Sequence, residues 1–246
     1  MNSIILHGAN STQVTPEELQ AVRTPEPSAT WTPIPHAALI ESVKREITMG
    51  DLAIAHESLV VSNARSGLFG DRFFGLLEIQ SSDESYRLTV AVRNSHDRMF
   101  PAGLCVGSRV CVCDNLAFSA EIVIARKHTR HIQRDLPRLI HEAVGRLGDL
   151  HERQTRRIAA YQETALSDAQ FHDVLIRSLD ARVICASKLP QVLEVYRKPV
   201  HEEFAPRTVW SGFNAFTSIL KAYDLLDLPR RTQALHGLCD QLSHLS

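Results

Sequence analysis

The stretch RNSHD at residues 93–97 places a guanidinium, an amide, a hydroxyl, an imidazole and a carboxylate at consecutive positions. His96 and Asp97 are the residue types of a general base and its orienting acid, and with Asp114 they could serve metal-dependent hydrolysis of nucleic acid. Neighbouring strand residues face opposite ways, and no nucleophile elbow stands nearby. The alternative to a catalytic role is a structural turn whose polar side chains form hydrogen bonds with the local backbone. Asp114 and Asn115, at the end of a predicted strand, could be structural in the same way.

Two cysteines, Cys111 and Cys113, flank a valine and therefore share one face of a predicted strand. A structural zinc site needs four ligands, usually in two such pairs, and the sequence has no second pair. The chain has 5 cysteines, an odd number, which favours reduced thiols in the core over disulfide bonds. The sequence therefore predicts no metal ion and no cofactor.

The stretch ARKHTRHIQRDLPR at residues 125–138 concentrates cations around a single acid. Placed where the last strand meets the following helix, these cations could form a groove that neutralises phosphates, the main source of sequence-independent affinity for nucleic acid. The alternative is the solvated start of a helix. The residues predicted to bind phosphates are Arg126, Lys127, Arg130, Arg134 and Arg138, with Arg93 and Arg98 extending the patch.

Hydrophobic periodicity predicts the elements that position these groups. Helical spacing predicts helices over 35–50, 135–165, 167–182, 210–226 and 230–245, with Asp135 and Ser167 as N-caps and Gly145 and Gly148 as weak points. Period-two runs predict strands over 56–62, 72–80, 86–94, 108–116 and 120–127, with a longer loop over 99–107. The fold class is therefore α+β: a curved, mainly antiparallel sheet of about five strands, then a long helix and a C-terminal helical region.

The chain is expected to have three parts. A Pro/Thr-rich flexible arm covers 1–34, an α+β core that ends in the long helix covers 35–165, and a helical region packed on the core covers 166–246. In the last part, Asn214 interrupts an apolar helix and is predicted to be hydrogen-bonded. Near the first hairpin, Phe69, Phe73 and Phe74 could stack on bases, although aromatic residues of a sheet belong more often to the core.

Charge and hydropathy limit the possible partners. Lys and Arg number 27 against 28 Asp and Glu, so any basic surface must come from local clustering. The apolar runs are shorter than the roughly 20 residues of a membrane span, and the N-terminus lacks a basic start and a cleavage site. We therefore expect a cytoplasmic protein without a membrane partner.

Six segments resemble, in order, the phage/plasmid-like family catalogued as domain of unknown function 932: IPHAALIESV, FFGLLEIQ, RNSHDR, GLCVGSRVCVCDNLAFS, RKHT and WSGFNAFTSILK. The resemblance runs from about Trp31 to the C-terminus. It implies a protein of a bacteriophage, prophage or plasmid in a bacterial host cell, often encoded near DNA-maintenance genes, and implies little about chemistry. The signature positions are Arg93, Asn94, Ser95, His96, Asp97, Cys113, Asp114, Asn115 and His128.

The predicted sheet and long helix, with cations where they meet, are also similar to the core of ring-forming single-strand annealing recombinases, by architecture only. The leading hypothesis is a non-enzymatic, oligomeric protein that binds or anneals single-stranded DNA in recombination or replication. One alternative is a protein-interaction or anti-defence factor with a host protein as target. The other is a metal-dependent enzyme on nucleic acid centred on His96, Asp97 and Asp114.

Overall fold

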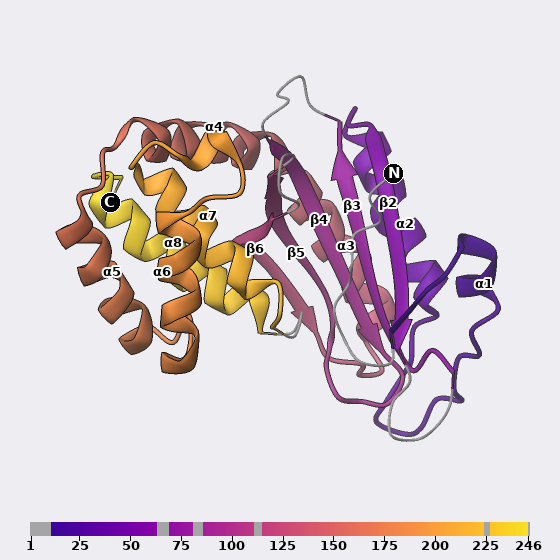
Figure 1. Cartoon of the computed structure of the whole chain (residues 1–246). Helices are drawn as coiled ribbons and strands as arrows, with labels where there is room; N and C mark the ends of the chain where they lie inside the picture. The colour runs from indigo at the N-terminus through magenta and orange to yellow at the C-terminus, as the bar shows by residue number, and fades with distance from the viewer. Residues whose placement is uncertain (1–10, 63–68, 81–85, 111–114, 224–226, 246) are drawn as a thin grey trace. The chain divides into compact units, whose positions relative to one another are not determined.

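The computed structural model describes residues 11–62, 69–80, 86–110, 115–223 and 227–245, without the side chains of 86, 108–110 and 115–123. The chain forms two compact units (Figure 1). The sheet unit comprises Met1–Asp83, Arg87–Val106 and Glu121–Gly148, and the helical unit comprises Glu84–Tyr86, Gly107–Ala120 and Asp149–Ser246. No helix among the described residues is both long enough and apolar enough to cross a membrane.

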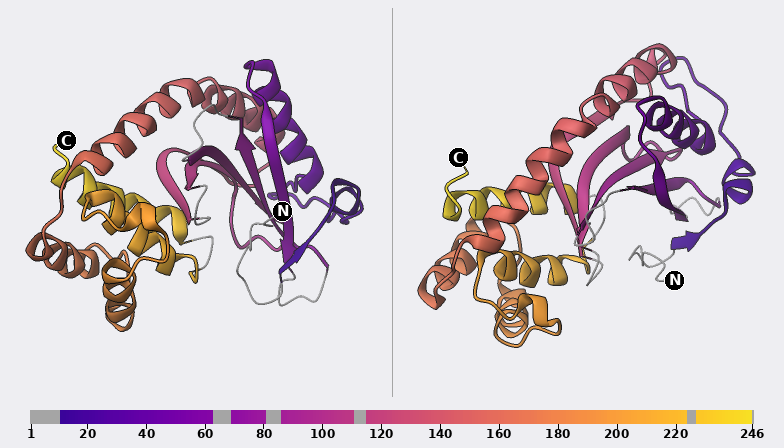
Figure 2. Two further views of the ribbon diagram at one scale, coloured as in Figure 1. Left: turned by 45° about the horizontal axis from the view of Figure 1, so that its top comes forward. Right: turned by 90° about the horizontal axis from the view of Figure 1, so that it is seen from above.

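Six strands form one open sheet in sequence order: β1 (Ser11–Gln13), β2 (Ile54–Ser62), β3 (Arg72–Ile79), β4 (Tyr86–Ser95), β5 (Ala102–Val110) and β6 (Asn115–Arg126). The pairs β1–β2, β2–β3 and β3–β4 are antiparallel. Figure 2 shows that the strands bend along their length. The predicted α+β class with a curved antiparallel sheet is therefore confirmed.

Two strands differ from the prediction. β1 comes from the segment expected to be a flexible arm, and it adds a strand at the edge of the sheet next to β2. β5 begins at Ala102, so most of the loop predicted over 99–107 is wrong. Leu104 and Val106 are buried on one face, but the other face carries Gly103 and the buried Cys105, so the period-two alternation by which a strand is recognised is weak.

The helix α2 (His36–Met49) covers one face of the sheet, and its predicted position is confirmed. Pro35 is its N-cap residue and Gly50 its C-cap, as expected from residues that start and stop helices. A Cβ built on Gly75 of β3 would lie 3.1 Å from Ile40, so the glycine lets the helix approach β3 closely. The buried face of α2 also includes Leu39, Val43 and Ile47.

The segment 11–34, predicted as an arm, packs on the sheet unit. It contains α1 (Pro16–Gln20), which starts with a capping box between Thr15 and Glu18. Leu19, Trp31 and Ile34 are buried. These apolar side chains tie the segment down along its length, although its Pro/Thr-rich composition is typical of an extended arm.

The long helix predicted over 135–165 is two helices, α3 (Ile132–Val144) and α4 (Leu147–Glu163), with the interruption at Gly145. Glycine lowers helix propensity by about 1 kcal/mol relative to alanine, which explains the break. The N-cap of α3 is His131, so the N-cap predicted at Asp135 is wrong and that carboxylate lies in the first turn. There it faces the positive end of the helix dipole.

The helical unit continues with α5 (Asp168–Asp180), η1 (Ala186–Lys188), α6 (Leu189–Arg197), η2 (Glu202–Phe204), α7 (Val209–Leu220) and α8 (Leu228–Leu242). The predicted N-cap Ser167 is confirmed, because its hydroxyl accepts a hydrogen bond from the backbone of Gln170. Asn214 donates to the carbonyl oxygen of Trp210 over 2.9 Å, as expected for a buried amide. The prediction missed α6, a helix of 9 residues with a proline at its start and another two residues after its end, because prolines so close together indicate a loop.

Candidate nucleic-acid interface

Asn94, on β4, is the centre of a buried polar network. Its Nδ2 donates to the carbonyl oxygen of Ile34 over 2.7 Å and to Nδ1 of His36 over 2.9 Å. Its Oδ1 accepts from Nε2 of His128 over 2.7 Å. The exposed fraction of Asn94 is 0%. One fully buried amide therefore joins β4 to segments that lie 60, 58 and 34 residues away in the sequence.

The hydrogen bonds assign a tautomer to each histidine of the network. Nε2 of His36 and Nε2 of His96 donate to backbone carbonyl oxygens over 2.8 and 2.9 Å. Asn94 donates to Nδ1 of His36 and accepts from Nε2 of His128, so all three rings carry a proton on Nε2. The rings of His36 and His96 are stacked with their centroids 3.8 Å apart. Protonation of one stacked ring would disfavour protonation of the other.

The three histidines are neutral because they are buried. Burial lowers the pKa of His36 to about 3, and the adjacent His96 ring acts in the same direction. Burial lowers the pKa of His128 to about 4. Burial also lowers the pKa of His96, although a backbone carbonyl and two nearby carboxylates oppose the shift. At neutral pH the network is therefore an uncharged set of hydrogen bonds.

This network holds the segment around Trp31 against the loop that follows β6. The backbone N–H of Thr32 donates to the carbonyl oxygen of His128 over 3.0 Å. The ring of Trp31 lies 6.1 Å from the ring of His128, measured between centroids. The guanidinium of Arg98 lies over the ring of Trp31, 4.6 Å from its centroid. Residues before α2, after β4 and after β6 are thus brought together.

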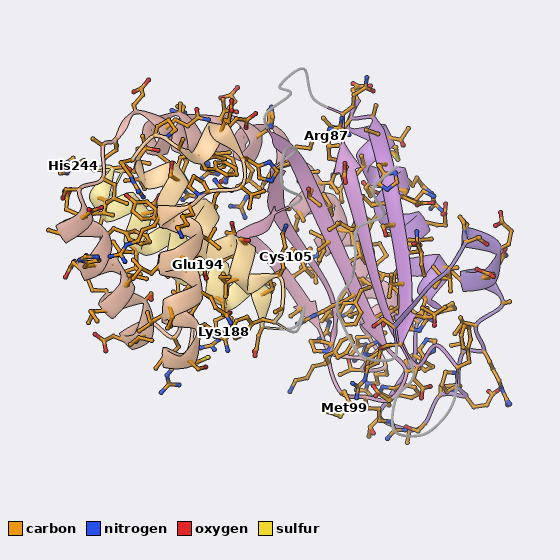
Figure 3. The ribbon with its side chains drawn as sticks, viewed as in Figure 1. Arg87, Met99, Cys105, Lys188, Glu194 and His244 are labelled. Atoms are coloured by element: carbon orange, nitrogen blue, oxygen red, sulfur yellow. The ribbon has the colours of Figure 1, made fainter. Side chains whose placement is uncertain are left out.

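The end of the RNSHD stretch forms a hydrogen-bonded turn. Asp97 accepts from Nε of Arg72 over 2.7 Å with one carboxylate oxygen and from the backbone N–H of Met99 over 3.2 Å with the other. The hydroxyl of Ser95 accepts from the backbone N–H of Phe100 over 3.3 Å. These contacts are those of the structural turn considered from the sequence. Figure 3 shows Met99 at the end of the sheet where β4 stops.

Three cations at this end of the sheet are exposed and have no carboxylate partner in the described part of the chain. Arg98, Lys127 and Arg130 are exposed, and none of them forms an ion pair with a carboxylate of the described residues. Nε of Arg130 donates only to the neighbouring His131 ring over 3.0 Å. Arg98 has a φ of 64°, a left-handed conformation that the surrounding turn must hold in place. We call Arg98, Lys127 and Arg130 the cation patch.

The other predicted phosphate-binding residues have carboxylate partners or lie elsewhere. Arg126 and Arg134 donate to the same carboxylate, that of Asp135, over 2.6 and 2.8 Å. Arg138 pairs with Glu142 one turn along α3. Arg93 points from β4 towards the ring of Phe100, at 5.6 Å from its centroid. The basic stretch is therefore divided into arginines paired with carboxylates, at the end of β6 and on α3, and cations of the intervening loop that have no carboxylate partner among the described residues.

The residues considered for catalysis do not meet in the described part of the chain. Nε2 of His96 bonds the Ile34 carbonyl inside the network, whereas Asp97 bonds Arg72. Asp114 and Cys113 lie outside the described residues, as does the side chain of Asn115, the first residue of β6. Among the described residues, no group of three or more His, Cys, Asp and Glu side chains is placed to hold a metal ion. Cys105 and Cys239 are buried free thiols, and Cys185 is an exposed one.

Sequence reasoning missed two members of this site, Trp31 and His36. Both lie in WTPIPHA, where the prolines indicated an extended arm and then a helix start. The signal that was available is chemical: a tryptophan and a histidine beside two prolines are costly to leave in solvent or to bury without partners. The positions of their partners on β4 and after β6 depend on the sheet, and no local pattern specifies them.

A cavity of about 520 Å³ lies beside the network, between α1, the first turn of α2 and β2. His36 forms part of its wall, together with apolar side chains such as Leu19, Ile40 and Leu59. The carboxylates of Glu17 and Glu41 also line it. Because two carboxylates repel a phosphate, this cavity is a poorer candidate for a nucleic-acid backbone than the cation patch.

Comparison with known proteins gives a family and no further match. The family model described as Domain of unknown function (DUF932) matches residues 26–236. No curated protein and no solved structure matches the chain. The matched range includes the network, the cation patch and most of the helical unit.

Proposed function

Since the chain belongs to the family described as Domain of unknown function (DUF932), a description that names no activity, we propose a function from the geometry: the protein binds the phosphate backbone of nucleic acid at the cation patch. The observation that carries this proposal is the arrangement of Arg98, Lys127 and Arg130, which are exposed and have no carboxylate partner among the described residues. Unpaired cations held close together are the features that phosphate groups neutralise, with release of counterions.

The positions of these cations are fixed rather than left to flexible side chains alone. Lys127 and Arg130 flank His128, whose ring is bonded to Asn94 and whose carbonyl oxygen is bonded to Thr32. A cation on an anchored backbone loses less freedom when it binds a phosphate, so the buried network supports binding without touching the ligand.

Exposed apolar side chains lie on the two turns beside the patch. Phe69 is 55% exposed and Met99 is 67% exposed. Their turns are joined where the backbone N–H of His96 donates to the carbonyl oxygen of Asp71 over 2.7 Å. The ring of Phe69 can stack on an unpaired base and Met99 can pack against one, which favours a single strand as the partner. The sequence resemblance adds a phage or plasmid setting to the proposal, so single-stranded DNA in the host cytoplasm is the polymer to test first.

Removing the cation patch is expected to abolish most of the affinity for nucleic acid. The triple variant Arg98→Ala, Lys127→Ala, Arg130→Ala should bind a labelled 20-nucleotide oligo(dT) about 100-fold more weakly in low salt, because about three phosphate contacts are lost. Fluorescence anisotropy measures this affinity directly. Circular dichroism and the melting temperature should stay close to those of the wild type, because the three side chains are exposed.

A matched control removes the same charge elsewhere. Arg156, Arg197 and Lys198 are exposed residues of the helical unit, and their replacement by alanine lowers the net charge by the same amount. This control should change the affinity by less than about threefold, since screening limits the effect of distant charges. Equal losses in the two triple variants would show that net charge alone governs binding and would contradict the proposed site.

A further inference from the structure

Arg93, a cation of the sheet unit outside the cation patch, is half-buried, and no carboxylate of the described residues pairs with it. It is opposite Phe74 in the β3–β4 register, whereas its neighbour Asn94 is opposite Phe73, which stacks on His36 of α2. Because successive strand residues face opposite ways, Arg93 lies on the sheet face away from α2.

The surroundings of Arg93 are rings, a glycine and a thiol. Its guanidinium lies 5.6 Å from the centroid of Phe100, and the rings of Phe100 and Phe74 lie 5.5 Å apart. A Cβ on Gly103 of β5 would lie 3.2 Å from Nε of Arg93 and 2.7 Å from the carbonyl oxygen of Ile124, so only glycine leaves room here. Cys105, labelled on β5 in Figure 3, lies near enough to raise the pKa of Arg93, against the larger lowering by burial.

Neighbouring arginines of the same sheet are paired, which sets Arg93 apart. Arg72 bonds Asp97 over 2.7 Å, and Arg87 bonds Glu78 over 3.4 Å. In the described part of the chain, the side chain of Arg93 makes neither a hydrogen bond nor an ion pair. A guanidinium has five N–H donors, and partial burial without an acceptor costs free energy that a bound anion would recover.

We propose that Arg93, with the ring pair Phe74 and Phe100, is a second phosphate subsite that takes one nucleotide of a single strand and rejects duplex DNA. The phosphate oxygens accept from the guanidinium, in the paired geometry that arginine favours. The adjacent base lies over the accessible face of the guanidinium, since Phe100 itself is only 7% exposed. This inference rests on the proposed function, since Phe100 follows Arg98 and Met99 in the same turn and links the subsite to the cation patch.

The preference for a single strand follows from the position of the guanidinium. It lies along a sheet face between β4 and β5 rather than on an exposed tip. A single strand can bend and turn a phosphate and its base into such a place, whereas the phosphates of a stiff duplex lie on a convex surface. The cation patch, by contrast, is exposed and accessible to both polymers.

The test compares Arg93→Met with the wild type on labelled oligo(dT), on the same strand paired with oligo(dA), and on free thymidine monophosphate. Arg93→Met should bind the single strand about tenfold more weakly and the duplex within about twofold of the wild type. Arg93→Lys keeps the charge but not the paired donors, so its affinity for the single strand should lie between those of the wild type and Arg93→Met. Millimolar thymidine monophosphate should compete with the single strand in the wild type and not in Arg93→Met.

A stability measurement separates a ligand site from a structural role. Removal of an uncompensated, half-buried charge should leave the melting temperature unchanged or raise it, whereas loss of a structural residue would lower it. The subsite is contradicted by a lowered melting temperature, by equal losses for single strand and duplex, or by tighter binding of the mononucleotide than of the strand. Unchanged binding by Arg93→Met, with binding lost in the cation-patch variant, overturns the subsite alone. A wild type that binds no polymer overturns both proposals.

Discussion

Asn94→Ala is expected to lower the free energy of unfolding of the sheet unit by about 4 kcal/mol. The substitution removes three hydrogen bonds and leaves the buried donor of His128 and the buried acceptor of His36 without partners. Each unsatisfied buried polar group costs about 1–3 kcal/mol, and the missing amide also leaves a small void. Urea denaturation followed by tryptophan fluorescence measures the change, because Trp31 lies against His128.

Two substitutions serve as controls for Asn94→Ala. Ser95→Ala removes a neighbouring buried hydroxyl that bonds only within its own turn, so its cost should be about 1–2 kcal/mol. Gln133→Ala changes an exposed side chain of α3 and should alter stability by less than about 0.5 kcal/mol. A cost for Asn94→Ala no larger than that for Ser95→Ala would show that the network does not hold the sheet unit together.

Acidification from pH 7 to pH 5 is expected to destabilise the sheet unit by about 4 kcal/mol. In the unfolded chain a histidine has a pKa of about 6.5, whereas in the fold the pKa of His36 is about 3 and that of His128 about 4. The unfolded state therefore binds more protons below pH 6.5, so the stability present above that pH is lost as the pH falls. Each of the two histidines contributes about 2 kcal/mol at pH 5, and His96 acts in the same direction.

The pH dependence can be assigned to the network with a single variant. His128→Gln keeps a donor for Oδ1 of Asn94 but cannot take up a proton. The loss of folding free energy between pH 7 and pH 5 should therefore be about 2 kcal/mol smaller in this variant. His131→Gln, at an exposed position of the same loop, should leave the loss unchanged, because His131 lies outside the buried network. Urea denaturation at pH 5, 6, 7 and 8 provides the comparison. An identical pH dependence in His128→Gln and the wild type would contradict the neutral, buried state of His128.

The elements that were predicted correctly are those whose ends are marked by residues close to them in the sequence. α2 begins after Pro35 and ends before Gly50, and α5 begins after Ser167, because proline, glycine and a hydroxyl cap act within one turn of the chain. The first part of β5, residues 102–107, was predicted as a loop because it has only small or apolar residues on both faces. Alternation of apolar and polar residues predicts a strand only when the two faces of the strand differ in polarity.

The site could be predicted only in part. The basic stretch was found because its cations are close in the sequence, but the pairing of Arg126 and Arg134 with Asp135 depends on where α3 begins. The RNSHD stretch was recognised as polar, and a turn was among its interpretations. The bonds from Asn94 to His36 and His128 cross 58 and 34 residues and depend on strand order, for which one sequence holds no direct signal.

The salt dependence of oligo(dT) binding by the wild-type protein tests the proposed function most directly. Three cations of the patch, with Arg93 as a fourth contact, should give a plot of log affinity against log salt concentration with a slope of about −2 to −3. The same plot for the cation-patch variant should be shallower by about 2. A wild-type slope near zero, or the same slope in both proteins, would contradict phosphate binding at Arg98, Lys127 and Arg130.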